Sequence, residues 1–112
     1  MKFSVNQSDL QKSLNYCQGI IEKRSTLPIL SNILLEASNS KLVITATDLD
    51  LIFINEIKDI EIQEDGKTTT SSSILYDIIR KLSSGKKINF SFSGENKLQL
   101  ESEKSIFHLN CI

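Results

Sequence analysis

The sequence predicts an α+β fold in which two amphipathic helices pack on antiparallel sheets. One observation is that apolar residues alternate with polar ones in most segments, as in half-buried strands, but recur every three or four residues in two others, as in helices. The second is that the order strand, helix, strand, strand, strand occurs twice, over about residues 1–60 and 61–112. Short connections between successive strands favour antiparallel pairing. We therefore expect one domain, residues 1–112, built from two related halves.

The first half starts with a strand over residues 1–6, where Phe3 and Val5 alternate with polar neighbours. Asn6 or Ser8 can cap the helix that follows, which we expect to end near residue 23. Its apolar stripe consists of Leu10, Leu14, Cys17 and Ile21. Three strands are then predicted over residues 29–37, 41–47 and 49–57. In the middle strand Leu42, Ile44 and Ala46 share one face, which the helices should cover.

The second half follows a turn predicted at Glu64-Asp65-Gly66 and starts with a short strand, Thr68–Thr70. The serines at 71–73 can cap the second helix. Its apolar residues are Ile74, Leu75, Ile78, Ile79 and Leu82. Three further strands are indicated by alternating apolar residues: Ile88, Phe90 and Phe92, then Leu98 and Leu100, then Phe107, Leu109 and Cys111. Turns are expected at Gly85 and at residues 94–96.

Each helix has one apolar stripe, so the polar sides of both should face outward together. The residues expected there are Gln11, Lys12, Gln18, Asp77, Arg80 and Lys81. A shared outward helical surface is therefore the first place to look for function.

Composition excludes several classes of protein. The 112 residues carry 13 basic and 14 acidic side chains, a net charge of -1, so there is no overall attraction to nucleic acid. Cys17 and Cys111 form neither a CxxC pair nor a disulfide framework, and we expect reduced thiols. With no secretory leader and no long apolar run, we expect a cytoplasmic protein without membrane contact.

No set of residues forms a recognisable active site. Asp48 and Asp50 could hold a divalent cation if further oxygens converged, but a turn residue and a solvated strand start explain them more simply. His108 is the only histidine and has no nucleophile partner. The segment Ser83-Ser84-Gly85-Lys86-Lys87 resembles the end of a P-loop but lacks the earlier glycine and the final Ser or Thr. We therefore expect no catalytic residue, no metal and no cofactor.

The remaining candidates are cations. Lys12, Lys23, Arg24, Arg80 and Lys81 form a sparse basic set that could contact phosphates without reading bases. Ordinary solvated side chains are the alternative interpretation, and the sequence pattern alone does not separate the two.

Three stretches resemble a known family: Met1–Val5, Arg24–Asn32 and Thr45–Asp50. Together they are similar to the N-terminal domain of the bacterial DNA polymerase III beta sliding clamps. The similarity continues through Asp77, Ile78, Arg80, Leu82, Gly94, Glu95 and Phe107. Clamp subunits of this family contain three such domains, and two subunits close head to tail into a ring around duplex DNA, so the resemblance implies the first domain of a non-catalytic processivity factor.

The resemblance also implies roles for individual residues. Contacts to the DNA backbone fall to Arg24, Lys12, Arg80 and Lys81. Contacts to the third domain of the second subunit fall to Ile74, Ile78 and Phe107. The pocket for DNA polymerase and clamp-loader peptides lies between the second and third domains in this family, outside this chain.

Two features depart from the family pattern. Serines occupy positions 71–73, where relatives often have a basic residue, and the hairpin at 101–104 is acidic. Two alternative functions are a protein-interaction module of unrelated origin and a small hydrolase that uses Asp48 and Asp50 with a metal.

Overall fold

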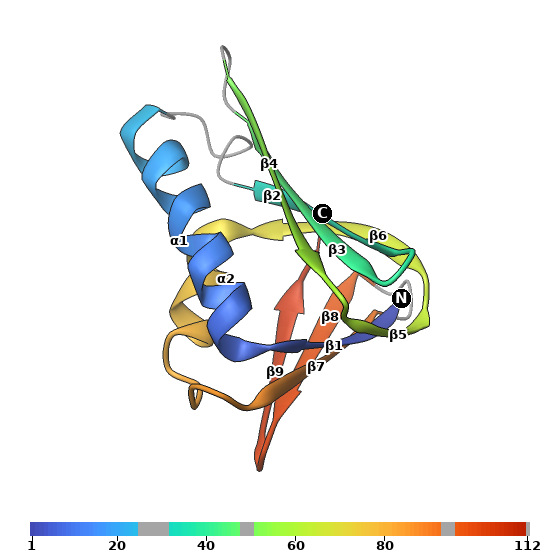
Figure 1. Ribbon diagram of the computed structural model, residues 1–112. Coiled ribbons are helices and arrows are strands. Elements are labelled where there is room, and N and C mark those ends of the chain that lie inside the picture. The colour runs from blue at the N-terminus through green and yellow to red at the C-terminus, as the bar shows by residue number, and fades with distance from the viewer. Residues whose placement is uncertain (25–31, 48–50, 93–95, 112) are drawn as a thin grey trace.

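The computed structural model describes residues 1–24, 32–47, 51–92 and 96–111, without the side chains of residues 19–24 (Figure 1). Its helices are α1 (Gln7–Arg24) and α2 (Ser72–Ile79). Its strands are β1 (Lys2–Asn6), β2 (Asn32–Ser38), β3 (Lys41–Thr47), β4 (Ile52–Lys58), β5 (Glu61–Glu64), β6 (Gly66–Ser71), β7 (Lys87–Phe92), β8 (Lys97–Ser102) and β9 (Ser105–Asn110). The predicted α+β fold is confirmed. The expected strand residues 29–31 and 49–50 lie outside the described residues.

The strands form two antiparallel sheets whose order interlocks the two halves of the chain. One sheet has the order β5-β1-β7-β8-β9 and the other β4-β3-β2-β6. The first strand of each half therefore pairs with the three-strand meander of the other half: β1 pairs with β7, and β6 pairs with β2. Each helix carries the chain from one sheet to the other, so neither half has a complete sheet of its own.

Strand β5 was not expected, and it corrects the predicted turn. It pairs with β1 through Phe3 and Ile62, and only Asp65 separates it from β6. Gly66 therefore begins a strand, and the prediction that it belongs to a turn was wrong. Its small size is required by a close approach, because a Cβ atom at this position would lie 2.6 Å from Met1 Cβ. Ile62 is the only apolar residue of β5, too few for a period-two pattern.

Both helices begin where the sequence places a cap. The backbone N–H of Ser8 donates to Asn6 Oδ1 over 2.9 Å, and that of Ile74 donates to Ser71 Oγ over 3.3 Å. Helix α1 extends to Arg24, within a residue of the expected end. Helix α2 ends at Ile79, so Leu82 is not helical, although it still packs against the core.

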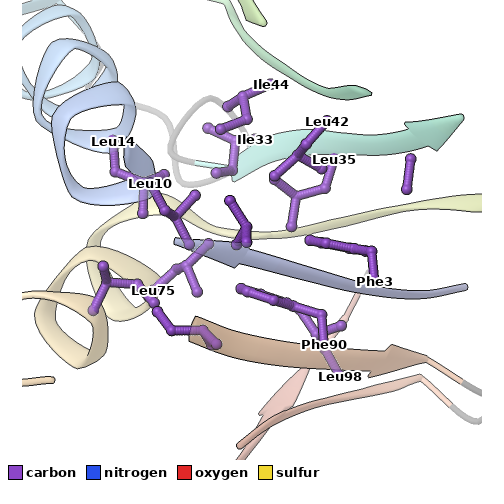
Figure 2. Packing of buried hydrophobic residues seen from close by; sticks show 14 of the residues in the cluster. Phe3, Leu10, Leu14, Ile33, Leu35, Leu42, Ile44, Leu75, Phe90 and Leu98 are labelled. Atoms are coloured by element: carbon purple, nitrogen blue, oxygen red, sulfur yellow. The ribbon is translucent and has the colours of Figure 1, made fainter. Parts of the chain in front are cut away.

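The core lies between the two sheets and beneath the helices (Figure 2). Leu10 and Leu14 of α1 and Leu75 of α2 point into the same interior as the inner faces of the sheets. Leu42, Ile44 and Ala46 are buried there, as predicted. Across β1 and β7 the rings of Phe3 and Phe90 stack, with centroids 4.7 Å apart. Burying each large apolar side chain contributes about 1.5–3 kcal/mol, so this shared core holds both halves together.

The α-amino group of Met1 fastens the start of β1. It donates to Glu64 Oε1 over 2.9 Å and to the carbonyl oxygen of Phe92 over 3.1 Å. The hydrogen bond from this ammonium, together with its charge, lowers the pKa of Glu64 below its ordinary 4.5. The ion pair therefore joins the chain terminus to the strand that the sequence did not predict.

We expect Glu64→Gln to reduce the loss of stability in acid. Because the folded-state pKa of Glu64 is lowered, its contribution is present above the ordinary pKa of 4.5 and is lost as the pH falls below that value. Urea unfolding of the 112-residue chain between about pH 3 and about pH 7 measures this dependence. Glu103→Gln, in the exposed β8–β9 turn, is the matched control. An acid dependence that is the same in both variants would contradict the role of Glu64.

Candidate nucleic-acid surface and subunit edge

The two helices pair antiparallel and form one layer on one side of the molecule (Figure 1). Three hydrogen bonds fix the pairing. Gln7 Nε2 donates to the carbonyl oxygen of Ile79 over 2.7 Å. The Tyr76 hydroxyl donates to Asn15 Oδ1 over 3.2 Å, and Ser72 Oγ donates to Gln18 Oε1 over 2.8 Å. The beginning of α1 therefore lies beside the end of α2, and Gln18 lies beside the beginning of α2.

One of the residues expected on the outward surface is buried. Gln18 is only 7% exposed, because its side chain turns toward α2 and accepts the hydrogen bond from Ser72. The prediction that Gln18 faces outward was wrong. Gln11 is half-buried and accepts from Gln7 Nε2, so it contributes little to the outer surface. The residues with exposed side chains on this layer are Ser8, Asp9, Lys12, Asn15 and Tyr16 of α1, Ser73, Ile74 and Asp77 of α2, and Arg80 and Lys81 just after it.

Three of the four predicted phosphate contacts lie on this layer. Lys12 is exposed in the middle of α1 and lines a groove against β4. Arg80 follows α2 directly, where it forms an ion pair of 3.1 Å with Asp77 and lies 5.7 Å above the ring of Tyr76. Lys81 is exposed beside it. Because Asp9 and Asp77 are also exposed, the positive charge of the layer is modest.

The fourth predicted contact, Arg24, is the last residue of α1, and its side chain is outside the described part of the structure. The backbone of α1 nevertheless defines the position of residue 24. Since α2 starts beside Gln18, residues 19–24 continue α1 past α2, by about 9 Å at the usual helical rise of 1.5 Å per residue. Arg24 therefore ends a projection of the helical layer.

The other candidates from the sequence do not assemble a catalytic site. Asp48 and Asp50 lie outside the described residues. His108 is exposed on β9, opposite Gln99. Residues 83–86 form a turn that leads into β7, and Lys87, the first residue of that strand, pairs with Glu61. In the described part of the chain, no three His, Cys, Asp or Glu side chains lie close enough to hold a metal ion.

Two of the three predicted subunit contacts, Phe107 and Ile74, lie around one edge of the five-stranded sheet, and the third, Ile78, is half-buried on α2 and packs against the core. β9 is the outer strand of that sheet and carries the half-buried Phe107. The end of β9 lies beside β6, where Thr70 bridges Cys111 and its hydroxyl donates to the carbonyl oxygen of Asn110 over 3.2 Å. Because β6 leads directly into α2, the first turn of α2, with Ile74 51% exposed, starts close to the end of this edge strand.

Two apolar groups were missed by the sequence analysis. Ile106, 54% exposed, lies next to Phe107 and on the opposite face of β9. Ile52 and Ile54 are 66% and 61% exposed on β4, the outer strand of the other sheet. The sequence shows that Ile52 and Ile54 alternate with Phe53. It does not show which face of this strand is exposed to solvent.

Among the residues that the structure describes, no helix is long and apolar enough to cross a lipid bilayer.

Comparison with known proteins identifies the family. The model of the DNA polymerase III beta subunit, N-terminal domain, matches residues 1–112. The chain belongs to this family. It is 40% identical over 110 residues to the beta sliding clamp of Caulobacter vibrioides NA1000 and 35% identical over 112 residues to that of Escherichia coli K12. These alignments cover 97% and 100% of this chain, but only 29% and 30% of the relatives.

Solved sliding clamps have the same fold. A Caulobacter crescentus DNA polymerase sliding clamp superposes with a TM-score of 0.90 at 39% identity, and the DNA polymerase III beta subunit of Pseudomonas aeruginosa with 0.91 at 30%. Each alignment covers all of this chain and 30% of the other. A match over the whole chain disfavours the alternative of an interaction module of unrelated origin.

Proposed function

We propose that this chain is the first domain of a three-domain sliding clamp subunit, a non-catalytic processivity factor for DNA polymerase. The observation that carries the proposal is the match of all 112 residues to the N-terminal domain of the family, with a chain that spans about 30% of its relatives. The two similar halves, about residues 1–60 and 61–112, form one domain in this proposal. Two further clamp domains would complete the subunit.

The helical layer would line the hole of the ring. Lys12, Arg80, Lys81 and Arg24 would contact phosphates of duplex DNA without regard to sequence, because contacts to phosphate oxygens position a protein on the duplex but carry no sequence information. A modest positive charge is sufficient, since a closed ring stays on DNA by topology and needs only weak, reversible contacts to slide. The net charge of -1 is therefore compatible with this function.

The edge formed by β9 and α2 would close the ring. Edge strands pair readily with another chain, and apolar side chains beside them add contact area. Ile74, Ile78 and Phe107 would meet the third domain of a second subunit, head to tail. The DNA polymerase and clamp loader would bind other domains of the subunit, and the assembled ring would act in the cytoplasm without a cofactor.

Retention on circular DNA tests this function. The full-length protein, loaded on nicked circular DNA, is expected to remain bound when the salt concentration is raised, and to be released when the circle is cut. Contacts to phosphates alone weaken steeply with salt on either form of DNA. Equal retention on circular and linear DNA would refute encirclement, and would leave the family membership and the fold unaffected.

A further inference from the structure

The junction between β6 and α2, at Ser71 and Ser72, contacts α1 at Gln18. Gln18 and Ser72 form a hydrogen bond between the helices, six residues before α1 ends at Arg24. Ser72 is completely buried and Gln18 is 7% exposed, so bulk water does not compete for this bond. The two residues are 54 positions apart in sequence, and the bond therefore fixes one half of the chain against the other.

The same junction also contacts the chain after Arg24, at the start of β2. Ser71, the cap of α2, pairs in the sheet with Asn32, the first residue of β2. Ser71 and Ser72 thus contact the chain both before and after Arg24. The sequence pattern predicted these serines as a helix cap.

We propose that Ser72 and Gln18 are positioning residues for Arg24. The inference rests on the proposed contact of Arg24 with DNA. Apolar packing of α1 on the sheets is non-directional and tolerates small rotations of the helix, whereas a hydrogen bond requires a defined distance and angle. A small rotation at Gln18 moves the end of the projection farther than it moves the rest of α1, because the displacement grows with distance from the pivot. The Ser72–Gln18 hydrogen bond therefore determines the backbone position of Arg24.

A double-mutant cycle on the full-length ring tests this role. The variants are Ser72→Ala, Arg24→Ala and the pair, with Ser73→Ala as the matched control, because Ser73 is exposed on the next position of α2. The readout is the dependence of duplex affinity on salt. Removing one phosphate contact lowers the logarithmic salt slope by about 0.9 and, between 50 and 200 mM salt, accounts for roughly a threefold change in affinity.

We expect Ser72→Ala to lower the slope nearly as far as Arg24→Ala, and to add little when Arg24 is already alanine. Ser73→Ala should leave the slope unchanged. Gln18→Met, which removes the amide partner of Ser72 and keeps a similar side-chain volume, should lower the slope at least as far as Ser72→Ala. If Ser72→Ala destabilises the domain, amide hydrogen exchange on the 112-residue chain still separates the alternatives: faster exchange confined to residues 19–24 supports the positioning role.

Three results would overturn the inference. The first is an equal loss of affinity from Ser72→Ala with and without Arg24, which would make Ser72 merely structural. The second is a normal salt slope in both Ser72→Ala and Gln18→Met while Arg24→Ala lowers it, which would refute the positioning role and keep the DNA contact. The third is a normal slope in Arg24→Ala itself, which would remove the proposed contact and the inference with it.

Discussion

Replacing Ile74 and Phe107 together with aspartate is expected to separate the full-length ring into single subunits. Ile74 is 51% exposed and Phe107 half-buried, and both lie around the edge where the end of β9 meets β6, the strand that leads into α2. In the closed ring these positions would be desolvated, and a carboxylate there would remain buried without a partner. Central apolar contacts of an interface contribute about 2 kcal/mol each when truncated, so each substitution should weaken association by roughly 30-fold or more.

Sedimentation velocity of the full-length protein measures the change, and the isolated domain reports whether it still folds. Ile52→Asp with Ile54→Asp is the control, since these apolar side chains are more exposed than Ile74 and Phe107 but lie on β4, the outer strand of the other sheet. A ring that persists in the Ile74 and Phe107 variant would exclude this edge as the subunit interface. Dissociation in the β4 variant as well would indicate a general effect of added charge.

The sequence predicted the elements of this fold well where the signal is local. The cap at Asn6, the cap at Ser71 and the buried face of β3 depend on residues within a few positions of each other. Spacing and side-chain chemistry over such short ranges determine which conformation satisfies the backbone and buries apolar groups. Apart from β5, the order of the elements and the buried face of β3 therefore followed from the pattern.

Long-range pairing could not be predicted in the same way. β1 and β6 each pair with strands of the other half because each helix connects one sheet to the other. The spacing of apolar residues does not determine that connection. β5 was missed because its pairing with β1 is supplied by tertiary structure and not by its own composition. Both features depend on pairings between segments far apart in the sequence.

Gln18 shows the same limit at the candidate site. A glutamine on an amphipathic helix is expected to face water, yet here its amide accepts a hydrogen bond from a serine on another helix. Its spacing contained a partial signal, because Gln7, Leu14 and Gln18 follow one stripe of α1 at intervals of seven and four, and all three are buried. The positions of Lys12, Arg80 and Lys81 on the helical layer agree with the sequence expectation, while the side chain of Arg24 is beyond the described part.

Reversing the charge of Lys12, Arg80 and Lys81 to glutamate is expected to have the largest effect on DNA binding. If each of these residues contacts a phosphate, the logarithmic salt slope should fall by about 0.9 for each phosphate that is no longer neutralised, and repulsion by the new carboxylates should weaken binding further. Between 50 and 200 mM salt the slope change alone corresponds to a roughly 40-fold difference in affinity. Duplex binding and retention on nicked circles, measured over a range of salt, give both quantities.

Position, and not net charge, should decide the result. Lys67→Glu with Lys97→Glu and Lys104→Glu changes the net charge by the same amount, but these exposed lysines lie on β6, β8 and the β8–β9 turn. Long-range repulsion is screened over about 8 Å at physiological salt, so cations on the sheets contribute little to DNA held against the helices. Arg80→Glu also breaks the ion pair with Asp77, but an exposed pair of this kind is worth only about 0.5 kcal/mol, too little to unfold the domain. Equal losses of affinity in the two triple variants would show that DNA responds to the charge of the whole domain, and the helical layer would then have no special role in binding.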